Sequence, residues 1–194
     1  MIFHPWNLSL NGSRKRQKSP RLWLGEWGPL IEFDFPSYWW SSSGGKVNVA
    51  IVTYLGDTYG RETELVPEPY SHERAVYNEW CAFIQMELDA HTLYVLRKHR
   101  DLADLYGEAP AAVTTAIAGF QKQVAVADAA LQSSDHLVGN QFTAADIIMT
   151  TTLKWAIAYN IDLTPRLREY TALHAARPAY RSAGRLTFSI SPGA

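Results

Sequence analysis

The ten residues 139–148, Gly-Asn-Gln-Phe-Thr-Ala-Ala-Asp-Ile-Ile, constrain the fold of this chain most, because they predict where a helix begins. Thr143 can cap this helix by accepting a hydrogen bond from the backbone N–H of Asp146, while the Asp146 carboxylate accepts from the N–H of Thr143. Phe142, just before the helix, and Ile147, inside it, have the spacing of a hydrophobic staple. We therefore predict a helix start at Thr143, and we assign Thr143 and Asp146 a structural capping role.

Two long amphipathic helices are predicted ahead of this start, the first with Ser71 as its N-cap. A shared spacing of three and four residues and a short connection, residues 107–110, predict that the two helices pack antiparallel. The apolar stripe of the first is Tyr77, Cys81, Ile84, Leu88, His91 and Val95, and that of the second is Val113, Ile117, Phe120, Val124, Ala127 and Leu131.

Shorter helices are predicted on either side. One covers residues 49–59 and stops at Gly60. Another starts at Thr164-Pro165, where the proline occupies the first helical position, and ends before Pro178, which can begin a last short helix. The residues expected to face inward from the helix at Thr143 are Ile147, Ile148, Thr151 and Trp155.

The chain is expected to divide at a linker, residues 66–70, where two prolines favour extended backbone. Residues 71–190 then form an all-α domain, and residues 1–65 form a separate N-terminal segment. The first 48 residues show no sustained helical or strand period, and they hold five of the seven tryptophans. They also contain a basic run, residues 14–18, which we interpret as solvated rather than as a nucleic-acid site.

Three features occur in a recognisable order: the helix of residues 50–60 followed by the Pro-Glu-Pro linker, the capping box, and the closing Ala-Arg-Pro-Ala-Tyr of residues 176–180. Over about residues 49–186 this order resembles the cytosolic glutathione S-transferases of bacterial type. The resemblance implies a mainly α fold, in which a helical C-terminal bundle follows a truncated or degenerate thioredoxin-like α/β segment.

The resemblance also implies a function. In that family, the thiolate of glutathione attacks or reduces a small electrophile, with glutathione as co-substrate and no further cofactor, and the chains form homodimers. The alternative is a catalytically silent helical module for dimerisation or binding. This alternative stays open because the N-terminal segment departs from the family pattern, and no thiol-activating residue can be assigned in it.

Particular residues take roles from the same resemblance. Asn48, together with Val47, stands where the family has a Glu-Ser pair, so Asn48 is the one residue of the two that could hold glutathione. Asp89, Leu93 and Trp155 are expected to line the acceptor site. For Leu93 and Trp155 the alternative is core packing, and for Asp89 it is plain solvent exposure.

Composition argues against other classes of protein. The 194-residue chain has a formal net charge of −1, so neither nucleic acid nor an anionic membrane is an expected partner. Its six histidines show no metal-ligand spacing, and no metal is expected. Its single cysteine, Cys81, lies on the predicted core stripe and fits a reducing compartment. With no apolar run near the length of a membrane span, we expect a cytoplasmic protein.

Overall fold

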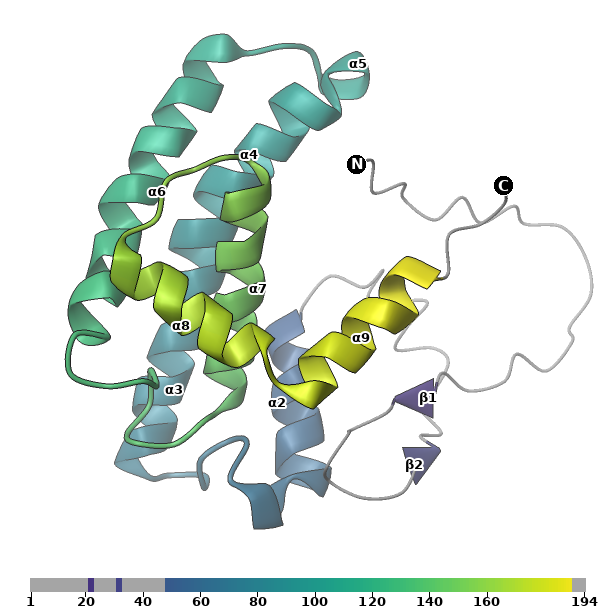
Figure 1. The fold of residues 1–194 in the computed structure, drawn as a ribbon, viewed down its shortest axis with the longest axis vertical. Coiled ribbons are helices and arrows are strands. Elements are labelled where there is room, and N and C mark those ends of the chain that lie inside the picture. Colours follow the sequence, from purple (N-terminus) through teal and green to yellow (C-terminus); the bar gives the residue numbers. More distant parts are fainter. Residues whose placement is uncertain (1–20, 23–30, 33–47, 190–194) are drawn as a thin grey trace, which may run out of the picture.

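The computed structural model describes residues 21–22, 31–32 and 48–189 (Figure 1). Over residues 48–189 the chain is helical, which confirms the mainly α fold. Two short strands, β1 (Arg21–Leu22) and β2 (Ile31–Glu32), pair antiparallel, with Arg21 opposite Glu32. Most of the expected degenerate thioredoxin-like segment, residues 1–65, falls outside the described residues, as do Val47 and the side chain of Asn48.

The helices follow the order that the sequence predicts. The elements are α2 (Asn48–Tyr59), η2 (Arg61–Thr63), α3 (His72–Phe83), η3 (Ile84–Leu93), α4 (Tyr94–Leu96), η4 (Arg97–Asp101), α5 (Ala103–Tyr106), α6 (Pro110–Ala130), α7 (Ala144–Ala158), α8 (Pro165–Ala175) and α9 (Pro178–Ser189). None of the helices in this part of the chain is long and apolar enough to cross a membrane.

Capping residues set several of these boundaries. The Ser71 hydroxyl accepts a 3.0 Å hydrogen bond from the N–H of Arg74, and the Thr164 hydroxyl accepts one of 3.3 Å from Leu167. Pro165 and Pro178 each open a helix, where a missing N–H costs nothing because the first turn has no intrahelical acceptor for it. These helix starts were all predicted from local sequence, and the structure confirms them.

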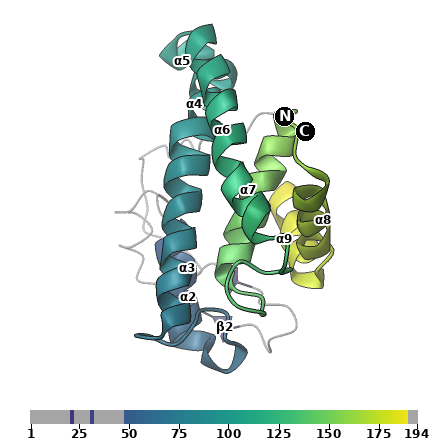
Figure 2. The same cartoon turned by 90° about the vertical axis from the view of Figure 1, so that its left-hand side faces the viewer.

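The segments α3, η3, α4 and η4 form one long continuous helical run, and α6 returns alongside it (Figures 1 and 2). The first part of the long run, α3 and the start of η3, follows the predicted stripe, with Tyr77, Cys81, Ile84 and Leu88 buried. Beyond Leu88 the stripe prediction is wrong at His91, which is exposed, whereas Val95 is half-buried and packs against the core. The fully buried positions there are Thr92, Leu93 and Leu96.

The cause is the π-helical geometry of η3. A π-turn takes more residues than the 3.6 of an α-turn, so the inward face moves along the sequence relative to a regular stripe. The Thr92 hydroxyl, which becomes buried by this shift, donates a hydrogen bond to the carbonyl of Leu88 one turn earlier. That bond satisfies a polar group which would otherwise be costly to bury.

Helix α7 lies between the long helical run and α8, with α2 also against it (Figure 1). Because neighbours cover it on several sides, its buried set is wider than one stripe. Ile148 is buried as predicted, but Thr151 is exposed, and its hydroxyl donates to carbonyls of the preceding turn. The side chains buried instead include Ala145, Met149, Thr152, Leu153 and Ala156.

Helix α2 is fastened to the bundle by Arg74 of α3. The guanidinium donates two hydrogen bonds to the Asp57 carboxylate, 2.9 and 2.6 Å long, and a third of 2.6 Å to the carbonyl of Pro67 in the linker. The Thr53 hydroxyl also lies 2.8 Å from the Tyr77 hydroxyl. These contacts fix α2 and the linker relative to the α-helical domain.

Candidate functional site

Trp155, one of the three predicted acceptor-site residues, belongs to a polar and aromatic cluster where the end of α7 meets η4. The rings of Trp155 and Tyr159 have centroids 5.9 Å apart and are tilted by 37°. The Tyr159 hydroxyl donates a 2.5 Å hydrogen bond to the Asp101 carboxylate. The guanidinium of Arg100 lies 5.2 Å from the centroid of the Tyr159 ring. A partly accessible aromatic surface is thereby bordered by charges of both signs.

Asp89 of η3 is half-buried, so it is not plainly solvent-exposed, and burial raises the pKa of its carboxyl. The positive charge of Arg97 opposes that shift. Burial and the hydrogen bond to Asp101 raise the pKa of Tyr159 to about 12, and Arg97 again acts in the opposite direction. Arg97 is therefore near enough to act on both groups, and Tyr159 stays a neutral hydrogen-bond donor at physiological pH.

The structure places the three predicted acceptor-site residues differently. Trp155 and Asp89 are each half-buried, which leaves part of both side chains accessible. Leu93 has no exposed surface and packs in the hydrophobic core, in line with its alternative interpretation. Asn48 is the first residue of α2, and its side chain lies outside what the structure describes. Within the described residues, this arrangement supplies no activated nucleophile.

Cys81 is a thiol in the described part of the chain, but it is not an activated nucleophile. Its side chain is 2% exposed, and burial raises the pKa of its thiol to about 11, although a hydrogen bond with Tyr77 acts in the opposite direction. Because the thiolate is the reactive form of cysteine, the Cys81 thiol is inert near neutral pH. The interpretation of Cys81 as a core residue is confirmed.

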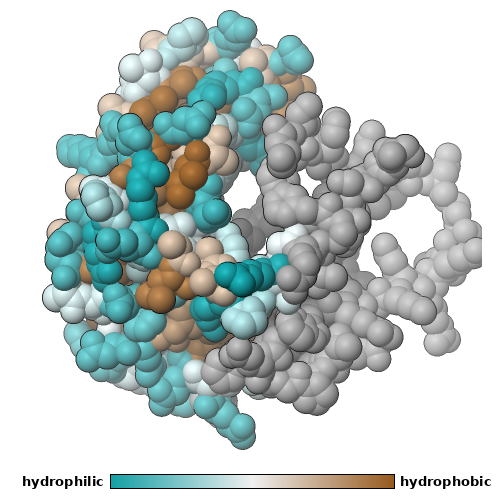
Figure 3. Space-filling model, in the orientation of Figure 1, coloured by the Kyte–Doolittle hydropathy of each residue, from teal (hydrophilic) through white to brown (hydrophobic). Residues whose placement is uncertain are grey.

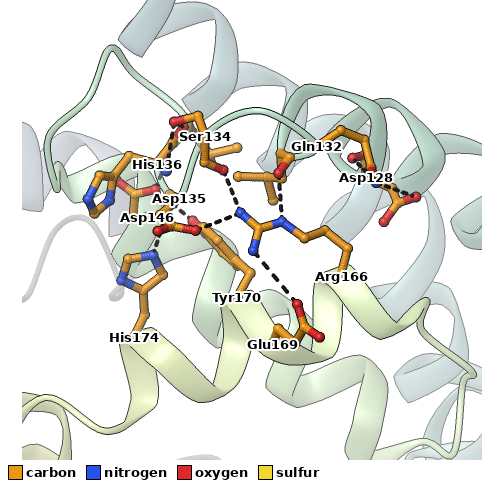
Figure 4. A network of polar contacts seen from close by, with 12 residues as sticks. Asp128, Gln132, Ser134, Asp135, His136, Asp146, Arg166, Glu169, Tyr170 and His174 are labelled. Atoms are coloured by element: carbon orange, nitrogen blue, oxygen red, sulfur yellow. Dashed lines mark hydrogen bonds and ion pairs between the residues drawn. The ribbon is translucent and has the colours of Figure 1, made fainter.

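A second polar network surrounds Asp146, and Figure 4 shows much of it. The predicted capping box with Thr143 is present, and the Asp146 Oδ2 accepts from the Thr143 N–H at 2.8 Å. Its Oδ1 accepts from the Leu137 N–H at 3.0 Å and from the Tyr170 hydroxyl at 2.7 Å. The carboxylate thus joins the start of α7, the preceding loop and α8, which extends the capping role that was predicted.

Arg166 of α8 was missed from the sequence and anchors the same loop. Its Nε donates to the Leu131 carbonyl at 2.6 Å, and a terminal nitrogen donates at 2.7 Å both to the Ser134 carbonyl and to the Asp135 carboxylate (Figure 4). These partners lie more than 30 residues away in sequence. No local pattern could have indicated them.

A groove of about 530 Å³ opens between η3 and α6. His91, which leaves the core because of the π-turns, borders it, and Gly119 and Ala116 of α6 form much of its floor. Glu87 and Gln123, joined by a 3.1 Å hydrogen bond, close one end. On the face seen in Figure 3, hydrophobic surface occurs as separate patches among hydrophilic residues.

Comparison with protein families gives one match. A model of the glutathione S-transferase C-terminal domain matches residues 110–176, which span α6, α7 and α8. No curated protein matches the chain.

Solved structures extend the likeness to 71–73% of the chain. The chain is similar to a glutathione transferase from Methylococcus capsulatus strain Bath, at 27% identity and a TM-score of 0.61, covering 73% of this chain and 66% of that one. It is similar to BphK, a bacterial glutathione S-transferase solved as a ternary complex, at 26% identity and a TM-score of 0.60, covering 71% and 65%. It is also similar to a sphingomonad glutathione S-transferase complexed with glutathione, at 25% identity and a TM-score of 0.59, covering 71% of this chain and 65% of that one. The chain thus spans slightly less than two thirds of the length of these structures.

Proposed function

Because this chain is related to the glutathione S-transferase family through its C-terminal helical domain, we propose that it binds glutathione and uses its thiolate against a small electrophile. The observation that carries the proposal is the match of the helical domain, together with the fold shared with structures solved with glutathione. The reaction is a nucleophilic attack by sulfur on the electrophile, or its reduction by glutathione. Either requires the thiol to lose its proton first.

The proposal divides the work between two parts of the chain. Residues before α2, with Asn48, would hold glutathione and lower the pKa of its thiol by hydrogen bonding. Trp155 and Asp89 would form the side that receives the electrophile. The half-buried indole supplies apolar surface for an aromatic acceptor, and the bordering charges of Asp89 and Arg97 favour acceptors that carry polar substituents.

The test is a direct assay of conjugation. The full chain is incubated with glutathione and 1-chloro-2,4-dinitrobenzene, whose product is the conjugate cocrystallised with a Phanerochaete chrysosporium neighbour. We expect formation of the conjugate above the uncatalysed rate, with saturation in glutathione. A rate equal to the uncatalysed one, for this and for a peroxide substrate, would contradict the proposal.

A second candidate function is a silent helical module for binding or dimerisation. It is favoured by Val47 and Asn48, which stand where the family places its glutathione-binding Glu-Ser pair, and by the inert Cys81. The two candidate functions predict different affinities for glutathione: a transferase binds it, and a module that has lost the glutathione site does not.

Two further properties follow from the family relationship as proposals. We propose that the chain forms a homodimer, which sedimentation of the purified protein tests. We also propose a cytoplasmic location, supported by the single buried, unpaired cysteine, because a reducing compartment keeps thiols free. Fractionation of cells that express the chain from its own gene tests the location.

A further inference from the structure

Two histidines and a carboxylate that are far apart in sequence meet beside the capping box. His136 comes from the loop between α6 and α7, Asp146 from the first turn of α7, and His174 from the last turn of α8 (Figure 4). One ligand atom of each lies within 4.8 Å of the others. The centroids of the two imidazole rings are 5.4 Å apart. Within the part of the chain that the structure describes, no other group of three such side chains is found.

The hydrogen bonding of His174 leaves one of its nitrogens able to act as a ligand. Its Nε2 lies 3.0 Å from the carbonyl oxygen of Asp135. Since a carbonyl oxygen only accepts, Nε2 carries the proton, and Nδ1 of the neutral ring keeps its lone pair. Histidines that bind metals commonly donate their other nitrogen to a backbone carbonyl in this way.

His136 provides an independent observation. Its Nδ1 is enclosed by protein, and among the described residues nothing forms a hydrogen bond with it. Buried polar atoms without a partner are uncommon in folded proteins, because leaving one unsatisfied costs about 1–3 kcal/mol. A cation bound to the Nδ1 atom of His136 would give this buried nitrogen a partner for its lone pair.

Asp146 supplies negative charge at a fixed place. Its two oxygens already accept hydrogen bonds from the Leu137 N–H, from the N–H and hydroxyl of Thr143, and from the Tyr170 hydroxyl. These bonds immobilise the carboxylate, as the bonds to carboxylates in metal sites do. We therefore assign the ligand lone pairs to the two imidazoles and the charge balance to Asp146.

We propose that His136 and His174, facing Asp146, form a binding site for a divalent transition-metal ion of the Zn²⁺ type. Neutral imidazole suits Zn²⁺, Ni²⁺ and Cu²⁺, whereas Mg²⁺ and Ca²⁺ require oxygen ligands. Zn–N bonds of about 2.0–2.1 Å require ligand atoms roughly 3.3 Å apart, and the ligand atoms here lie within 4.8 Å of one another, so a small movement of His136 is enough. His136 can move in this way because it lies in a loop rather than in a helix.

One nearby cation limits the affinity. The guanidinium of Arg177 lies 3.4 Å from the centroid of the Phe142 ring, and its charge acts on His174. We therefore expect dissociation constants in the micromolar range rather than the far tighter binding of structural zinc sites. The bound ion would link the loop before α7 to the end of α8.

The test uses the full chain without a polyhistidine tag, titrated with ZnCl₂ in a calorimeter and with CoCl₂ in an absorption spectrometer. We compare the parent with His136→Ala, with His174→Gln, which keeps a donor for the Asp135 carbonyl, and with the control His91→Ala at an exposed position of η3. Circular dichroism establishes that every variant is folded before titration.

We expect one ion per chain in the parent and the control, and at least a tenfold loss of affinity in each of the other two variants. Cobalt should give visible absorption bands that the same two variants lose. The proposal is overturned by absence of saturable binding to the folded parent, or by equal affinity in all four proteins, since the ion would then be held elsewhere. Neither result depends on whether the chain binds glutathione.

Discussion

The hydroxyl of Tyr170 donates a 2.7 Å hydrogen bond to the carboxylate of Asp146, and neither side chain has any exposed surface. The two residues are 24 positions apart and lie in α8 and α7. The carboxylate that caps the start of α7 is thereby also bonded to α8. Burial and the charge of Asp146 raise the pKa of Tyr170 well above its ordinary value, so the hydroxyl stays a donor.

Removing the Asp146 carboxylate should therefore destabilise the loop before α7 and the contact with α8 as well as the start of α7. In Asp146→Ala, the buried N–H groups of Leu137 and Thr143 and the Tyr170 hydroxyl lose their acceptor. We expect a loss of roughly 3–5 kcal/mol in the free energy of unfolding. Urea denaturation measures it. Tyr170→Phe removes one donor only and should cost about 1–2 kcal/mol; equal losses in the two variants would contradict the described role of the carboxylate.

A close contact between α2 and the linker gives a second prediction. A Cβ atom added at Gly56 would lie 2.2 Å from Cγ2 of Val66, far inside van der Waals contact. Gly56→Ala should therefore lower the free energy of unfolding by roughly 1–3 kcal/mol, and adding Val66→Ala should recover part of that loss. The matched control is Gly119→Ala in α6, where the nearest atom is 3.5 Å away. That change should be neutral or stabilising by up to about 1 kcal/mol.

The pH dependence of stability should report on His174. Because burial lowers its pKa in the folded state below the reference value of 6.5, the unfolded chain binds more protons near that pH. Stability therefore falls as the pH drops through the unfolded pKa. The titratable and charged groups facing the ring are His136, Asp146, Tyr170 and Arg177, and the Asp135 carbonyl and the Phe142 ring also contact it.

The measurement is urea denaturation between about pH 7.5 and pH 5. His174→Gln should reduce the slope of stability against pH relative to the parent. His91→Gln, at an exposed position, should leave the slope unchanged. An unaltered slope in His174→Gln would show that other groups produce the acid sensitivity.

The proposed acceptor site predicts a specific kinetic effect. Trp155→Ala should lower kcat/KM for an aromatic acceptor by about tenfold through the loss of apolar contact surface. The apparent affinity for glutathione should be unchanged. Lys154→Ala, at an exposed position of α7 next to Trp155, serves as the control for general damage to that helix. A parallel fall in glutathione affinity would mean that Trp155 acts by holding the domain together.

Local chemistry explains what could be predicted from the sequence. The helix starts at Ser71, Thr143, Thr164 and Pro178 depend on residues within a few positions of each boundary, so sequence alone determined them. The inward face beyond Leu88 could not be found in this way, because a π-turn arises from packing and leaves no clear local pattern.

The same distinction applies to the sites. Asp146 was identified as a cap, but its bond to Tyr170 and the anchoring of the loop by Arg166 join residues that only the fold brings together. His136 and His174 are 38 positions apart, so the absence of ligand spacing among the histidines said nothing about them. Asn48 and the expected thiol-activating region lie where the structure gives no side chain.

Whether this chain binds glutathione decides between the transferase and the silent helical module, and calorimetric titration of the folded 194-residue chain measures it. We expect saturable heat with a dissociation constant between about 1 μM and 1 mM, equivalent to roughly −8 to −4 kcal/mol. Free cysteine, as a control ligand, should give none. No detectable heat with glutathione, from protein shown to be folded and helical, would contradict the transferase proposal and leave the silent helical module.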